Sequence, residues 1–169
     1  MPTITTALSK NFKIELLKGN HDLTAADIRI ALIKFGHTGD YDSDTLSWST
    51  LNSASDQPTG SGYSSAASDP AQPYNLFTGT GGGAVCAPEA GFPRIETGTT
   101  TATMDFVDAT FKTVTVQADG CIMYNDNIAE SGDNVIAIFD FGGTVSSTNG
   151  DFTIQFPAPG ATTSILRLA

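Results

Sequence analysis

Short apolar segments separated by turn residues dominate the end of the chain. Three of them are VIAIFDF at 135–141, FTIQF at 152–156 and SILRL at 164–168. Each has the length of a strand and is too short for a core helix. In 135–141 both alternating sets of positions are apolar, which is typical of a strand covered on both faces or buried at a subunit contact. We therefore predict a sheet whose central strand is 135–141.

Residues 142–150 between the first two segments carry turn chemistry. Gly142, Gly143 and the pair Asn149-Gly150 accept positive φ angles. This spacing predicts a long hairpin connection. In 152–156 the apolar positions alternate with Thr and Gln, which predicts a strand with one solvated face.

Alternation also appears near the start of the chain. Residues 12–17 place Phe12, Ile14 and Leu16 on one side, and the pattern predicts a first strand. Residues 28–35 fit both helical spacing and strand alternation. Their three isoleucines favour a strand.

The middle of the chain predicts further strands. Residues 46–51 contain the only tryptophan, Trp48, and we expect its ring in the core or against a neighbouring subunit. Locally connected antiparallel strands are then predicted at 100–111, 113–117, with a solvated threonine face, and 120–124.

Residues 53–91 interrupt this patterning, because they are rich in glycine, serine and proline and poor in aliphatic side chains. Such a segment cannot bury enough apolar surface to offset the entropy of its own ordering. It is either a mobile surface loop or an arm that packs against its own domain or a neighbouring protomer. Aromatic residues are spaced along it as potential anchors, namely Tyr63, Tyr74, Phe77 and Phe92.

The overall composition agrees with an all-β fold. The chain has 169 residues, only 15% of them charged, and abundant small and β-branched side chains, which favour sheets with many turns over helices. We predict one antiparallel β-sandwich domain, jelly-roll-like or Ig-like, over 1–169, with 53–91 as an extended loop or arm.

The formal net charge of −10 argues against some classes of binding partner. The first 35 residues sum to +2 (five basic, three acidic), so the remainder carries −12. An acidic surface repels phosphate backbones and argues against nucleic-acid binding. The basic charge of the first 35 residues either marks a contact face or has arisen by chance. Candidate interface residues are Trp48, Tyr63, Tyr74, Phe77, Phe92, Lys10, Lys13 and Lys18.

The acidic run Asp40-x-Asp42-x-Asp44 has the opening spacing of a calcium loop. Thr45 stands where an EF-hand requires glycine, and Leu51 stands where it requires glutamate, so an EF-hand is excluded. We expect a turn stabilised by aspartate hydrogen bonds, with a different, weak calcium site as the alternative.

No combination of side chains points to catalysis. The stretch 62–66 nearly spells a nucleophile elbow but lacks its final glycine, and the glycine-rich run 79–83 is not followed by the lysine of a phosphate loop. His21 and His37 have no second ligand at zinc spacing. We therefore predict no enzymatic activity, no cofactor and no metal, although a catalytic pair among the many carboxylates would not be recognisable from sequence.

The remaining chemistry concerns redox state and targeting. Cys86 and Cys121 are too few for a disulfide framework; two free or buried thiols are favoured, and a disulfide is the alternative. The N-terminus lacks a basic region followed by an apolar core, and no apolar run approaches ~20 residues. The expectation is a protein made in the cytoplasm and not inserted into a membrane.

Several stretches together resemble a known family. They include 23–33, 40–42, 62–63, 108–111, 120–125, 135–142 and 146–156, of which the last, Ser-Ser-Thr-Asn-Gly-Asp-Phe-Thr-Ile-Gln-Phe, is the most specific. Together they are similar to small virion structural proteins of tailed bacteriophages. The resemblance covers most of the chain apart from 53–91.

The resemblance implies a non-enzymatic capsid decoration or cement protein that stabilises the assembled head. It would act as a homotrimer on the capsid surface, with the major capsid protein as its partner, and it supplies no catalytic residues. The alternative is a tail or fibre module for host-surface or glycan binding, for which a pocket rimmed by Tyr63, Tyr74 or Trp48 would be expected.

Overall fold

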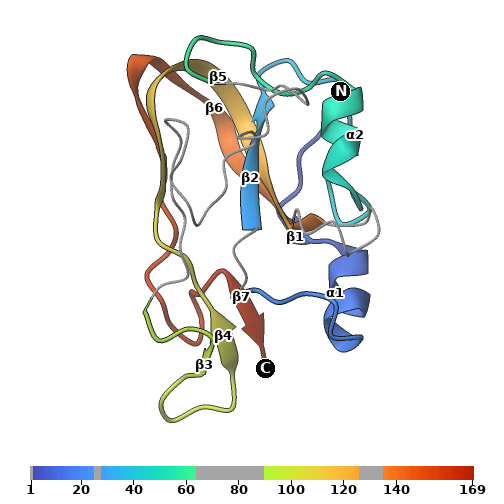
Figure 1. Ribbon diagram of the computed structural model, residues 1–169, viewed down its shortest axis with the longest axis vertical. Helices are drawn as coiled ribbons and strands as arrows, with labels where there is room; N and C mark the ends of the chain where they lie inside the picture. The colour runs from blue at the N-terminus through green and yellow to red at the C-terminus, as the bar shows by residue number, and fades with distance from the viewer. Residues whose placement is uncertain (1, 25–27, 64–89, 126–134) are drawn as a thin grey trace.

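The computed structural model describes residues 2–24, 28–63, 90–125 and 135–169 (Figure 1). In this part of the chain every pairing between strands is antiparallel, which confirms the predicted all-β antiparallel class. The elements in chain order are β1 (Ala7–Leu8), α1 (Lys10–Leu17), β2 (Ile28–Lys34), α2 (Trp48–Ser53), β3 (Arg94–Ile95), β4 (Ala102–Met104), β5 (Ala109–Asn125), β6 (Val135–Ile154) and β7 (Leu166–Leu168).

Two sheets organise these elements. The larger has the strand order β1-β6-β5-β2 and the smaller has the order β3-β4-β7. In Figure 1 the larger sheet and α2 occupy the upper part of the molecule, and α1 and the smaller sheet occupy the lower part. The long β5–β6 ribbon bends at the top of this view and connects the two parts.

The part of the four-stranded sheet around β2 and the start of β6 is buried on both faces. On one face Ile30, Leu32 and Met123 join a cluster that includes Phe111 and Phe152 from the distal part of the ribbon. The opposite face, with residues such as Ile33 and Ile122, packs against Tyr41 and Leu51. The strand predicted at 28–35 is therefore β2, and apolar side chains occupy both faces of the strand that begins at Val135, as predicted.

A bulge alters the alternation predicted for 135–141. Met123 pairs with Ala137 and Tyr124 pairs with Val135, so Ile136 is an extra residue in β6. A bulge of this kind places two successive side chains on the same side. Ile136 and Ala137 consequently share one cluster, while Val135 lies in the other.

The long hairpin predicted at 142–150 is wrong, because β6 continues through these residues. Gly120 pairs with Asp140 and Ala118 pairs with Val145. Residues 141–144 of β6 therefore stand opposite the single residue Asp119 of β5 and form a large bulge. Gly142 and Gly143 have φ angles of 73° and 154° there. Glycine at positive φ serves a bulge as well as a turn, so the composition alone could not distinguish the two.

Two segments predicted as strands are short helices. Residues 12–17 fall in α1, where Phe12 and Leu16 lie one turn apart and pack on the core, while Leu17 is 90% exposed. Gly19, at φ 75°, follows the last turn, and its N–H donates to the carbonyl of Leu16. Residues 46–51 overlap α2, whose Leu51 is buried.

The described start of the insertion packs on the sheets. The N–H of Thr115 donates to the carbonyl of Ser61 at 2.8 Å, and a Cβ on Gly60 would lie 1.5 Å from the Thr115 carbonyl oxygen. Only glycine allows this approach. The Tyr63 hydroxyl accepts from the N–H of Leu32 and donates to Gln57. The rest of the predicted arm, 64–89, lies outside the described residues.

A buried carboxylate ties the 38–41 turn to the residues after α2. Asp56 is fully buried and accepts hydrogen bonds from the N–H groups of Thr38 and Gly39 at 2.9 Å and from the Tyr41 hydroxyl at 2.7 Å. Lys34 Nζ lies 3.6 Å from the carboxylate. Burial alone would raise the pKa of Asp56, but the donors and Lys34 together hold that pKa below its usual range.

Candidate functional site

An apolar groove of about 280 Å³ lies between α1 and the three-stranded sheet. Phe12 and Leu16 of α1 form one side of it, and strands β4 and β7 form the other. The full lining is Leu8, Phe12, Leu16, His21, Asp22, Leu23, Thr24, Pro93, Ala102, Thr103, Met104, Leu166, Arg167 and Leu168.

The three-stranded sheet carries a row of apolar side chains that begins in this groove and extends beyond it. Ile95 pairs with Ala102, and Ala102 pairs with Leu168. Directly paired residues in an antiparallel sheet share a face, so these three side chains form one row. Ile95 is 60% exposed and Leu168 is 59% exposed. The row is therefore only partly covered by this chain.

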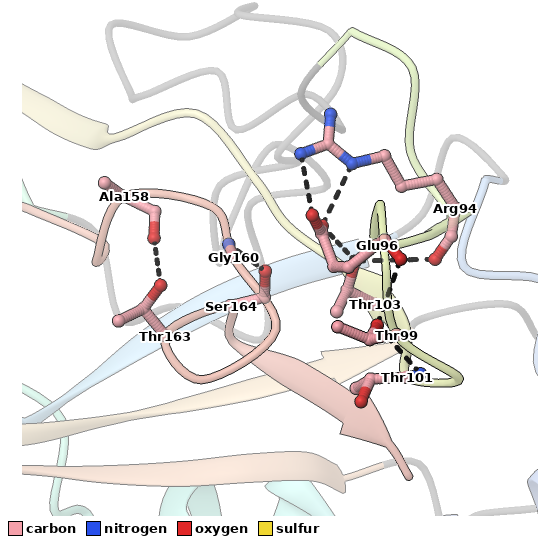
Figure 2. Close-up of polar contacts among 9 residues, drawn as sticks. All are labelled: Arg94, Glu96, Thr99, Thr101, Thr103, Ala158, Gly160, Thr163 and Ser164. Atoms are coloured by element: carbon pink, nitrogen blue, oxygen red, sulfur yellow. Dashed lines mark hydrogen bonds and ion pairs between the residues drawn. The ribbon is translucent and has the colours of Figure 1, made fainter.

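Polar contacts on the other side of the β3–β4 hairpin fix its shape. Figure 2 shows the guanidinium of Arg94 forked on Glu96, with Nε–Oε1 and Nη2–Oε2 distances of 3.0 and 3.2 Å. The Thr103 hydroxyl donates to Glu96 Oε1 at 2.8 Å. These bonds, that from Arg94 first, lower the pKa of Glu96. The geometry holds β3 against β4 and so fixes the Ile95 row.

The loop that leads into β7 is fixed in a similar way. The Thr163 hydroxyl donates to the carbonyl of Ala158 at 2.6 Å, and the N–H of Gly160 donates to Ser164 Oγ at 2.9 Å (Figure 2). Bonds within a short loop reduce its freedom to move. β7 therefore enters the small sheet from a defined position, which sets the place of Leu168.

His21 lies at the inner side of the groove. Its ring meets the Phe12 ring edge-on at 5.0 Å between centroids, and the Asn125 amide donates to Nδ1 at 3.4 Å. Burial lowers the pKa of His21, and Glu15 opposes this effect. This shift favours the neutral imidazole.

The groove can accept apolar side chains of a partner. Its walls are mostly aliphatic, and Leu17 of α1 and Leu168 of β7 are exposed leucines. Exposed apolar surface next to a groove marks interaction sites in many proteins. Covering such surface contributes about 25 cal/mol per Å² of apolar area.

The candidate interface lysines all lie on α1 or at its end. Lys10 forms an ion pair with Asp44, and Lys18 pairs with Glu15 at 2.7 Å. Lys13 is exposed. The helix that forms one side of the groove therefore carries two of the lysines, and the third, Lys18, caps its C-terminal end.

The candidate aromatic residues are spread over the molecule. Tyr63 is buried in the core. Trp48 is half-buried and stacks on Tyr124 at 5.3 Å, so its ring packs in this chain's own core, one of the two places expected for it. Phe92, next to the groove residue Pro93, lies under the Arg94 guanidinium at 4.3 Å. Tyr74 and Phe77 lie outside the described residues.

The acidic run forms the expected hydrogen-bonded turn. Asp40 accepts from the N–H of Thr3 at 2.8 Å, and Asp42 accepts from the N–H of Asp44 at 2.7 Å. In the described ranges, no three His, Cys, Asp or Glu side chains are grouped so that they could hold a metal ion. Cys121 is a free thiol in the core, where burial raises its pKa. Cys86 lies outside the described residues.

The sequence analysis did not predict the groove residues Leu23, Met104 and Leu168. The spacing of Phe12 and Leu16 fits a helix that forms one side of the groove, but the same residues also fit strand alternation. No local pattern indicates that α1 and β7, about 150 positions apart in the sequence, face each other.

Comparisons of the chain with protein-family models, with curated proteins and with solved structures found no match. Among the described residues, neither helix has the length and hydropathy needed to cross a membrane.

Proposed function

We propose that this chain is a capsid decoration protein of a tailed bacteriophage, which binds the assembled head through the apolar groove. The sequence resemblance to small virion proteins supports the class. The observation that carries the proposal is the groove itself, since its mostly apolar lining, with Leu168 exposed at its edge, suits a protein partner better than a polar substrate.

The physical role is adhesion to a repeated surface. The major capsid protein presents the same contact many times, and a homotrimer around a symmetry axis engages several copies at once, so avidity multiplies a modest contact. The chain would then lie on the outside of the virion and add resistance to internal genome pressure by tying neighbouring capsomers together.

The direct test mixes the purified protein with undecorated capsids. We expect saturable binding at symmetry axes, which can be quantified by co-sedimentation and located by electron cryomicroscopy. Leu168→Asp, which places a charge at the groove, should weaken binding at least about tenfold, because a buried unpaired charge is costly.

The matched control is Val145→Asp. Val145 is also an exposed apolar residue, 45% exposed, but it lies on β6 and not in the groove. It should bind capsids as the unmodified protein does. Absence of capsid binding at every salt concentration would contradict the proposed function, and equal losses in both variants would contradict the role of the groove.

The alternative function is a tail or fibre module that contacts the host surface. A hydroxyl-lined groove on the β5–β6 ribbon, described below, is the feature that favours it. Copy number distinguishes the two: a decoration protein is present in hundreds of copies per particle and a fibre in few, so quantification against the major shell protein in purified virions decides between them.

A further inference from the structure

A second groove, of about 400 Å³, lies on the other part of the molecule and has different chemistry. It is bounded by the end of β2, the 58–60 segment and the β5–β6 ribbon. Its volume is in the range of small-ligand sites, roughly 300–1,000 Å³. We call it the polar groove.

An exposed aromatic ring borders the polar groove. Phe35 is 58% exposed although it directly follows a buried strand. Its N–H donates to the carbonyl of Gln117 at 3.0 Å, and Gly36 beyond it turns the chain at φ 71°. The backbone that carries the ring is therefore held against the sheet, and the exposed ring offers an apolar surface beside the groove.

Hydroxyl and amide groups line the ribbon beside this ring. Gln117 pairs with Ser146, so their side chains share a face, and Thr115 and Thr148 follow at alternate positions on the same face. The side chains of Gln117, Ser146 and Thr148 have no hydrogen-bond partner among the described residues. These groups can donate to and accept from a ligand.

The polar groove is close to electrically neutral. Lys34 is the charged residue in its lining, and Lys34 Nζ already donates to the Ser55 carbonyl at 2.7 Å and faces Asp56. A phosphate or sulfate would find no free cation there. The overall charge of −10 also opposes anionic ligands.

The 58–60 segment that borders the polar groove is held against β5. Gly60 lies directly on the Thr115 backbone, and the N–H of Thr115 donates to Ser61. The N–H of Asn149 donates to Thr115 Oγ1 at 3.0 Å and fixes the opposite strand. Such preorganisation lowers the entropy that a ligand must overcome.

We propose that the polar groove binds a neutral carbohydrate. The Phe35 ring stacks on the apolar face of a sugar ring, and Gln117, Ser146 and Thr148 hydrogen-bond to its hydroxyl groups. An aromatic platform beside neutral hydrogen-bonding groups matches a ligand that has one C–H-rich face and a polar edge. The assignment does not depend on whether the protein belongs to the head or the tail.

The test titrates the full chain with four neutral disaccharides, maltose, cellobiose, lactose and chitobiose, and follows saturation-transfer NMR. At least one should bind with a Kd near or below about 1 mM. Phe35→Ala should weaken that binding at least about tenfold, whereas Phe35→Trp should retain it. Thr148→Val, which removes one hydroxyl group at nearly constant volume, should weaken it about three- to tenfold.

The matched control is Ile95→Ala, which removes an exposed apolar side chain outside the polar groove and should leave sugar binding unchanged. Circular dichroism checks that each variant is folded; if Phe35→Ala is not, Thr148→Val decides. Binding of none of the four sugars overturns the proposal, and so does binding that Phe35→Ala or Thr148→Val leaves intact. Capsid binding is measured separately, so this result leaves the decoration proposal unaffected.

Discussion

The two sheets use their apolar side chains for different purposes. In the four-stranded sheet, strands β2, β5 and β6 bury apolar residues on both faces, and Ile33, Ile122 and Ile138 are fully buried. In the three-stranded sheet, Ile95 and Leu168 share a row that remains more than half exposed.

The difference shows that apolar content alone does not define a core. The larger sheet has a second layer on each face, namely the folded distal ribbon on one and the α2 side on the other. The smaller sheet is covered only in part, by α1 across the apolar groove. Met104 and Leu166 of the smaller sheet are themselves buried in the core, whereas Ile95 and Leu168 are not. We infer that the buried residues of both sheets stabilise the fold and that the exposed row of the smaller sheet recognises a partner, and the following variants test that division.

The largest effect is expected in the centre of the four-stranded sheet. Ile122→Ala removes three buried carbon atoms from a site that cannot collapse between two covered faces, so the free energy of unfolding should fall by about 2–5 kcal/mol. Ile122→Val should cost only about 0.5–1.5 kcal/mol. Urea denaturation measures both, and a loss below 1 kcal/mol for the alanine variant would show that this face is not tightly packed.

The second effect concerns the buried carboxylate beside the same sheet. The Thr38 and Gly39 N–H groups and the Tyr41 hydroxyl all donate to Asp56 Oδ2, while Oδ1 faces Lys34 Nζ. Asp56→Asn replaces the charged acceptor with a weaker neutral one and places a buried amide NH₂ beside the Lys34 ammonium group, which cannot accept a hydrogen bond. The free energy of unfolding should fall by about 2–3 kcal/mol, and the control Tyr41→Phe should lose about 1 kcal/mol.

The same variant has a pH signature with a defined sign. Because the pKa of Asp56 is lower in the folded protein, its ionised form contributes stability above about pH 4, and this contribution is lost as pH falls through the folded pKa. The stability difference between the unmodified protein and Asp56→Asn should therefore shrink on acidification. A difference that stays constant from neutral to acidic pH would contradict the lowered pKa.

The sequence predicted the larger sheet better than the smaller one. A strand buried on both faces is a nearly continuous apolar run, which is why the start of β6 could be recognised from the sequence. β2 also fitted helical spacing, and its isoleucines decided correctly for a strand. Phe12, Ile14 and Leu16 fit alternation as well as a helical turn, so the choice between strand and helix depended on tertiary contacts. One of them is the N–H of Lys10 donating to the carbonyl of Ser43.

The candidate sites could be predicted less well, because each combines distant residues. Three aromatic residues were proposed from sequence for a sugar site. Tyr63 and Trp48 pack on this chain's own core, and Tyr74 lies outside the described residues. Phe35 is the exposed ring. Phe35 lies in an apolar run that predicts burial. Phe35 is nevertheless exposed, at the end of β2 where Gly36 turns the chain at positive φ.

The smallest effect on stability is expected at the exposed row of the three-stranded sheet. Leu168→Ala removes a side chain that is 59% exposed, so the free energy of unfolding should change by no more than about 0.5 kcal/mol. Leu17→Ala, on the exposed side of α1, should behave in the same way, because Leu17 is 90% exposed.

If these leucines serve recognition, the two variants should unfold at the same urea concentration as the unmodified protein yet bind capsids more weakly. A loss of stability as large as that of Ile122→Ala would mean that the row belongs to the core, as Met104 and Leu166 of the same sheet do, and the inferred role of the row in recognition would then be wrong.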